Sequence, residues 1–131
     1  CGFGQSTIAG IVTRGCREMR LLTVALGGRP KTLAGLSGIG DLMLTCFSSL
    51  SRNNRCGRAL AQGKTADEIT KEMGEVVEGV PTASEVVSLA KTHKLHLPLF
   101  FAVNEIIAGR LTAESALRVL MRTPPGKETF T

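Results

Sequence analysis

Apolar residues recur at three- and four-residue steps along almost the whole chain, and this spacing constrains the fold more than any other feature. The longest such segment covers residues 6–26, which predicts an amphipathic helix. Every other strongly periodic segment is also helical, and links of roughly three to eight residues separate them. The sequence therefore predicts an all-α fold, an orthogonal bundle of seven or eight helices rather than an up-down four-helix bundle.

Local start and stop signals give the expected helix limits. Gly27 ends the first helix, and Ser51 is expected to cap a basic helix over residues 51–62. Thr65 and Glu68 form a capping box for the next helix, and residues 81–85 combine a proline with a second such box. Further helices are expected over residues 98–108 and from Thr112 onward.

The first helix carries a polar side opposite its apolar positions. Arg14, Arg17, Glu18 and Arg20 occupy much of that side. Arg14 is spaced to pair with Glu18 one turn later. This interpretation places Glu18 away from the apolar face of the helix.

Composition limits the classes of function. A chain of 131 residues with 43% hydrophobic and 21% charged residues is expected to be a single globular domain. Its net charge of +5 suits an anionic ligand. Nucleic-acid binding is disfavoured because the chain has no Trp or Tyr and its arginines are scattered. No apolar run is long enough for a membrane span, no signal peptide precedes Gly2, and the missing initial Met suggests a fragment or a processed chain.

Cysteine and histidine spacing argues against a metal site. The four cysteines show no CxxC pair and have no histidine at ligand spacing: Cys1, Cys16, Cys46 and Cys56. Their even number leaves two disulfides open, but Cys16 lies on the apolar face of its helix, and we favour reduced thiols in an intracellular protein. His93 and His96 are expected in an exposed loop, because no further ligand completes a set.

The stretch of residues 35–55 is too polar for a core and too specific in composition for a plain loop. Its glycine-rich bend, GLSGIG, is not a dinucleotide fingerprint, because no strand precedes it. The glycines allow unusual backbone angles and close backbone approach, and the bend is expected to place Asp41 at the start of a short helix. Thr45 follows one turn later on the same face. The alternative is that Asp41 is only a helix N-cap.

The residues from Ser51 to Arg55 suggest an anion site. Behind the Ser51 cap, the first N–H groups of the helix are free, and anions bind readily at such ends. The guanidinium of Arg52 beside those amides would hold a phosphate by charge-assisted hydrogen bonds. The alternative is a capped loop followed by a solvated basic helix.

Three separated motifs carry a family resemblance: GLSGIGDLMLTC, then LSRNNR, then VVEGVPTASEV. Together they resemble the C-terminal domain of NAD(P)-dependent glycerol-3-phosphate dehydrogenase, over about residues 2–121. The resemblance implies a fold like the C-terminal domain of 6-phosphogluconate dehydrogenase. It also implies a helical substrate domain over residues 1–122 and an N-terminal Rossmann domain absent from this chain. The two prolines and the glycine of residues 123–131 predict a flexible tail.

The same resemblance implies the roles of individual residues. The substrate-binding residues would be Asp41, Thr45, Ser51, Arg52 and Asn53, and Asp41 would also support a catalytic lysine that this chain lacks. NAD or NADP would be bound mainly by the absent domain and contacted here by Arg52, Val76 and Glu78. Ser6 and Ile8 stand where the family commonly has Asn and Lys, so no role is carried over to them.

The resemblance implies the substrate domain of an oxidoreductase that interconverts sn-glycerol 3-phosphate and dihydroxyacetone phosphate, within glycerol-3-phosphate metabolism and glycerophospholipid biosynthesis. The isolated chain is expected to be inactive, since it has neither the acid–base lysine nor the dinucleotide glycines. One alternative is a non-catalytic helical binding or oligomerisation module. Another is the substrate domain of a different dehydrogenase, which the Ser51-Arg52-Asn53 triplet disfavours. A cytoplasmic location is expected, with a plastid or glycosome left open, and a homodimer is possible.

Overall fold

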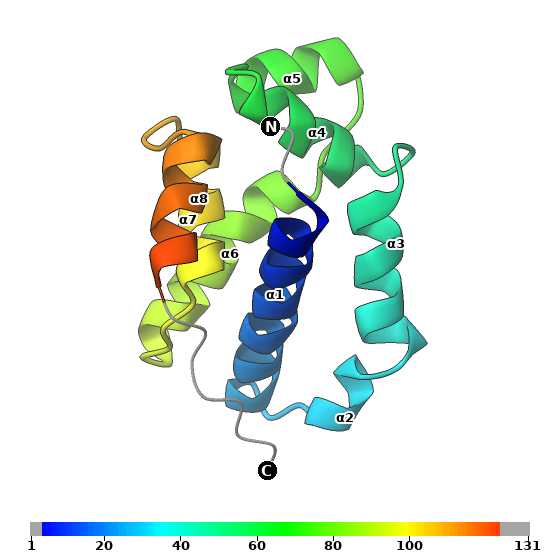
Figure 1. The fold of residues 1–131 in the computed structure, drawn as a ribbon, viewed down its shortest axis with the longest axis vertical. Helices are drawn as coiled ribbons and strands as arrows, with labels where there is room; N and C mark the ends of the chain where they lie inside the picture. The colour runs from blue at the N-terminus through cyan, green and yellow to red at the C-terminus, as the bar shows by residue number, and fades with distance from the viewer. Residues whose placement is uncertain (1–3, 124–131) are drawn as a thin grey trace.

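The computed structural model describes residues 4–123, and all regular structure within that range is helical. Eight α-helices and one π-helix, η1, follow one another there (Figure 1). They are α1 (Gln5–Ala25), α2 (Pro30–Leu33), η1 (Leu36–Gly40), α3 (Asp41–Phe47), α4 (Arg52–Ala61), α5 (Ala66–Met73), α6 (Gly79–Thr92), α7 (Pro98–Ile107) and α8 (Ala113–Arg122). The expected all-α bundle is confirmed.

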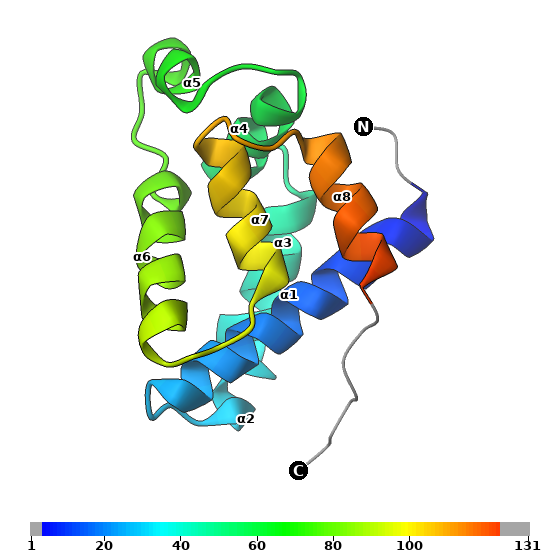
Figure 2. The ribbon, with the colours of Figure 1, turned by 90° about the vertical axis from the view of Figure 1, so that its left-hand side faces the viewer.

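Helix α7 organises one half of the molecule. It packs against α1, α6 and α8, and Figure 2 shows it between α6 and α8 with α1 crossing behind. In the other half, α4 contacts α3, α5 and α8. The buried apolar residues come from both halves: Cys56, Ile69, Val77, Ala83, Val87, Ala90, Leu97, Ala116 and Leu120.

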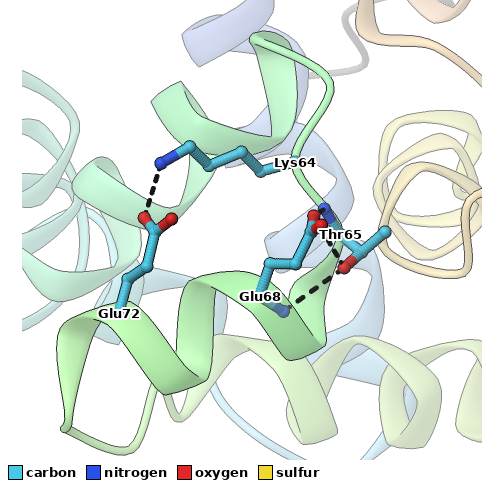
Figure 3. A network of polar contacts seen from close by, with 4 residues as sticks. All are labelled: Lys64, Thr65, Glu68 and Glu72. Atoms are coloured by element: carbon cyan, nitrogen blue, oxygen red, sulfur yellow. Dashed lines mark hydrogen bonds and ion pairs between the residues drawn. The ribbon is translucent and has the colours of Figure 1, made fainter.

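Three of the predicted helix starts have the expected cap. The hydroxyl of Ser51 accepts a hydrogen bond from the Asn54 N–H (3.3 Å), and Thr112 caps α8 in the same way. Thr65 and Glu68 form both bonds of the capping box, as Figure 3 shows. These bonds connect residues only three positions apart, which is why the sequence alone predicts them.

The second capping box, over residues 81–85, was wrong. Helix α6 begins two residues earlier, at Gly79, and has no side-chain cap. The Thr82 hydroxyl instead donates to the Glu78 carbonyl (2.7 Å), and the Ser84 hydroxyl donates to the Pro81 carbonyl (2.9 Å). Pro81 is tolerated because the first-turn positions need no intrahelical N–H donor.

The polar side of α1 is not uniformly exposed. Glu18 is 0% exposed, and its carboxylate accepts hydrogen bonds from the Leu99 N–H (2.9 Å) and the Phe100 N–H (3.1 Å) at the start of α7. Arg14 donates to the Thr123 carbonyl (2.7 Å) and forms no ion pair with Glu18. The predicted pairing was therefore wrong, because the unpaired amides of α7 are better partners for a buried carboxylate.

The glycine-rich bend is a π-helical turn that runs directly into α3. Gly38 is buried, and a Cβ at this position would lie 2.2 Å from the Leu33 carbonyl oxygen. Close backbone approach is thus the reason for glycine at this position. Among the described residues, the positive φ angles occur at Lys94 and at four other glycines, each of which follows the end of a helix: Gly27, Gly63, Gly74 and Gly109.

Three further expectations concern the C-terminal tail, a membrane span and the two histidines. The predicted tail, residues 123–131, lies outside the described residues apart from Thr123, and so does Cys1. No helix within residues 4–123 is long and apolar enough to cross a membrane. His93 and His96 are both exposed, as expected, and no group of three or more potential metal-binding side chains occurs in the described range.

Candidate functional site

A cleft of ≈ 400 Å³ opens where α3 ends and α4 begins. Its walls come from the end of α3, the loop that follows, the first turn of α4 and the segment before α6. The residues lining it are Leu44, Thr45, Ser48, Leu50, Ser51, Arg52, Asn53 and Glu78. The cleft therefore brings together five of the seven predicted site residues: Thr45, Ser51, Arg52, Asn53 and Glu78.

The first turn of α4 presents free donors. Among the described residues, no acceptor is bound by the backbone N–H groups of Arg52 and Asn53. The exposed Arg52 guanidinium uses Nη1 to donate to the Val76 carbonyl (3.2 Å), and its Nε and Nη2 make no further hydrogen bond within residues 4–123. Two amides and part of a guanidinium at a helix N-terminus are suitable donors for a phosphate or carboxylate.

Asn54 holds this corner in place. Its side-chain Nδ2 donates to the Cys46 carbonyl near the end of α3 (2.6 Å), and its Oδ1 accepts from Arg58 Nε (2.9 Å). Asn54 was not among the site residues predicted from the sequence. The only available signal was its place within the LSRNNR motif, which does not distinguish a structural asparagine from a ligand-binding one.

Two of the predicted cofactor-binding residues, Val76 and Glu78, lie in the segment before α6. Glu78 lines the cleft, is exposed, and its carboxylate makes no hydrogen bond to any described residue. Val76 is also exposed and is held by Arg52 through its carbonyl group. The cleft thus has a free carboxylate that can accept hydrogen bonds from a polar ligand and a partly free guanidinium that can donate to it.

Asp41 lies outside the cleft lining. It is the first residue of α3, exposed and one turn before Thr45 on the same helix. The N-cap of α3 is Gly40, so the alternative of Asp41 as a plain N-cap was wrong. Its carboxylate makes no hydrogen bond to the described part of the chain and is free to meet groups from outside it.

The cysteine thiols near the site are not activated. Desolvation raises the pKa of Cys46 above its usual value, and the neighbouring Cys16 adds to that increase. Desolvation also raises the pKa of Cys56. Cys16, Cys46 and Cys56 are free thiols. Since the thiolate is the nucleophilic form, the raised pKa values make Cys46 and Cys56 poor nucleophiles at neutral pH.

Comparison with known proteins places this geometry in a family. The family model described as NAD-dependent glycerol-3-phosphate dehydrogenase C-terminus matches residues 1–118. A glycerol-3-phosphate dehydrogenase (NAD(P)+) of Aromatoleum aromaticum is 50% identical over 128 residues, which cover 97% of this chain and 39% of that protein. A relative of the same name from Maricaulis maris is 46% identical over 128 residues.

A solved structure agrees with these relatives. The crystal structure of glycerol-3-phosphate dehydrogenase from Coxiella burnetii superposes with a TM-score of 0.87 at 38% sequence identity, covering 92% of this chain and 37% of that one. The chain thus spans less than two-fifths of the length of these matched relatives.

Proposed function

Because this chain belongs to the family of C-terminal domains of NAD-dependent glycerol-3-phosphate dehydrogenases, we propose that it is the substrate domain of such an enzyme. The enzyme would interconvert sn-glycerol 3-phosphate and dihydroxyacetone phosphate with NAD or NADP. The observation that carries the proposal is the open first turn of α4, where free amides and the Arg52 guanidinium face a cleft.

In this proposal the substrate phosphate binds at the start of α4. The N–H groups of Arg52 and Asn53 donate to its oxygens, together with the guanidinium nitrogens that Val76 leaves free. The Ser51 hydroxyl keeps that turn capped by accepting from Asn54. Anchoring the phosphate fixes the distance from this end of the substrate to its reacting carbon.

The remaining predicted residues act on the other end of the substrate or on the cofactor. The Thr45 hydroxyl lines the same cleft and can hydrogen-bond a substrate hydroxyl. Asp41 would favour the ammonium form of a lysine supplied by the rest of the enzyme. NAD or NADP would be the hydride carrier when bound. The Glu78 carboxylate and the Arg52 guanidinium, which belong to residues lining the cleft, fit its polar groups, and the exposed Val76 lies next to them through its bond to Arg52.

The apolar surface around the cleft supports the presence of a further domain. Leu44 is 69% exposed and Leu50 is 87% exposed, and both line the cleft. Other large apolar side chains of η1, α3 and the segment before α6 are exposed as well: Leu36, Ile39, Met43, Phe47 and Val76. A face of this kind is typical of a surface that another domain covers. The additional length of the relatives is sufficient for a dinucleotide-binding domain.

A domain exchange tests the proposal. Residues 1–131 would replace the matching segment of the Aromatoleum aromaticum enzyme, and oxidation of sn-glycerol 3-phosphate would be followed by cofactor absorbance. We expect the chimera to be active, and Arg52→Ala in it to raise KM for the substrate. The 131-residue chain alone should give no turnover. A folded chimera without activity would overturn the proposal, and turnover by the chain alone would refute its dependence on a second domain.

A further inference from the structure

The first turn of α4 also holds the segment that precedes α6. We call residues 75–79 the connector; it follows Gly74, the C-cap of α5, and ends at the first residue of α6. Three side chains of α4 reach it over a sequence distance of 20 to 26 residues. The contacts are Arg55 Nη2 to Glu75 Oε2 (3.3 Å), Arg52 Nη1 to the Val76 carbonyl (3.2 Å), and Asn53 Oδ1 to the Gly79 N–H (3.2 Å).

The connector is also fixed on its inner side. Val77 is 4% exposed and packs in a cluster with Cys56 of α4 and Ile69 of α5. One residue thus points into the core while its neighbours are held by polar contacts. The connector therefore has little freedom to slide along α4, because any shift would expose Val77 and break several hydrogen bonds together.

Gly79 is the tightest point of this arrangement. A Cβ at this position would lie 2.7 Å from Asn53 Oδ1 and 3.2 Å from its Cγ. A Cβ there would push the Asn53 carboxamide away from the Gly79 N–H and break their hydrogen bond. Gly57, within α4, is a useful contrast, since a Cβ there would meet nothing within 4 Å.

We propose that the Asn53–Gly79 pair is a latch that positions Glu78 on the cleft wall and couples the connector to an anion at the start of α4. The inference rests on the proposed function, because it needs the phosphate site there. Arg52 and Asn53 would bind the phosphate through their amides while their side chains hold the connector. Because the same two residues hold the anion and the connector, anion binding at this turn is transmitted to the connector, and a strained connector weakens anion binding by the same factor.

The test is an NMR titration of the ¹⁵N-labelled 131-residue chain with inorganic phosphate, at ionic strength matched with chloride. In the wild type, the amides of Glu78 and Gly79 should shift with the same Kd as those of Arg52 and Asn53. Gly79→Ala should raise that Kd about fivefold and remove the connector shifts. Gly57→Ala, the matched control, should leave both the Kd and the connector shifts unchanged.

A double variant separates a latch from general damage to the fold. Asn53→Ser shortens the side chain that a Cβ on Gly79 would meet. Adding it to Gly79→Ala should return the phosphate Kd to that of Asn53→Ser alone, because the collision is gone. If Gly79→Ala does not fold, Glu75→Ala is tested instead, because it removes the ion pair with Arg55 at the other end of the connector. The phosphate Kd should then rise about twofold, which corresponds to the free energy of one surface ion pair.

The outcomes keep the latch and the proposed function apart. Shifts at Arg52 and Asn53 without shifts in the connector would overturn the latch and leave the phosphate site standing. An unchanged Kd in Gly79→Ala would do the same. If Arg52 and Asn53 do not respond to phosphate at all, the phosphate site itself is overturned.

Discussion

Two helix N-termini in this domain differ in whether their first backbone N–H groups have a hydrogen-bond acceptor. At α7, the N–H groups of Leu99 and Phe100 are taken up by the carboxylate of Glu18, which is fully buried. At α4, the N–H groups of the first two residues, Arg52 and Asn53, have no acceptor among the described residues, and both residues line an exposed cleft.

The difference shows how one kind of interaction serves stability or binding. Both ends favour a negative charge for the same reason, namely unpaired N–H groups aligned with the helix dipole. At α7 the acceptor is a side chain of the same molecule, so its hydrogen bonds stabilise the fold. At α4 we propose that the anion is a ligand, so its interaction appears as affinity. Four experiments test this difference between the two helix ends.

The largest effect is expected from Glu18→Ala. The change leaves two amides of α7 without an acceptor and opens a cavity, and should lower the free energy of unfolding by about 3 kcal/mol. Chemical denaturation measures it. Glu85→Ala removes an exposed carboxylate of α6 and is the control, with an expected change within about 0.5 kcal/mol. Equal effects of the two substitutions would contradict the role of Glu18.

Arg52→Ala should act on binding instead. Losing a guanidinium that donates charge-assisted hydrogen bonds should weaken phosphate binding about thirtyfold while leaving unfolding nearly unchanged. Phosphate titration by NMR and chemical denaturation give the two quantities. Arg17→Ala, on the exposed side of α1, makes the same change in net charge and should leave affinity within about twofold. If Arg17→Ala weakens phosphate binding as much as Arg52→Ala does, the loss of affinity comes from the net charge of the chain and not from a binding site at Arg52.

Ser51→Ala and Thr112→Ala compare two capped helices, one with a proposed ligand and one without. Each loses one hydroxyl acceptor for a backbone amide, and each should destabilise the chain by about 1 kcal/mol. Only Ser51→Ala should also weaken phosphate binding. A matching loss of affinity in Thr112→Ala would show that the open end of α4 has no special part in binding.

The smallest expected effect is a change in pH dependence. Burial raises the pKa of Glu18 above its ordinary value of 4.5, although its two amide donors, Arg14 and His96 oppose the rise. The folded state then holds a proton that the unfolded state has lost, so stability should fall as pH rises from 4.5 through the raised pKa. Glu18→Gln should remove this decrease in denaturation curves measured from pH 4 to 7. An identical pH profile in the variant would show that Glu18 does not titrate in this way.

Much of the fold could be predicted because the signals are local. The Ser51 cap and the Thr65–Glu68 box involve residues three apart in the sequence. The limits of α7 follow from Pro98 and from helical spacing. The same kind of signal failed over residues 81–85, because a proline followed by Thr and Glu suits the interior of a first turn as well as its start.

The predicted site is partly brought together by the fold. Thr45, Ser51 and Arg52 line one cleft, as their closeness in the sequence suggested. The pairing of Asn53 with Gly79 could not be foreseen, since it joins residues 26 positions apart and depends on a missing Cβ. Asp41 remains a prediction, because its proposed partner is a lysine outside this chain.

Helical periodicity and capping act within about one turn, so the helices, most of their caps and the family of this domain could be recognised without a structure. Which helix end has an acceptor for its amides and which has none depends on the packing of the helices. That choice depends on whether a distant acceptor packs against the amides, as Glu18 does from 81 residues away. No local pattern specifies such a contact, since it exists only after the helices have packed.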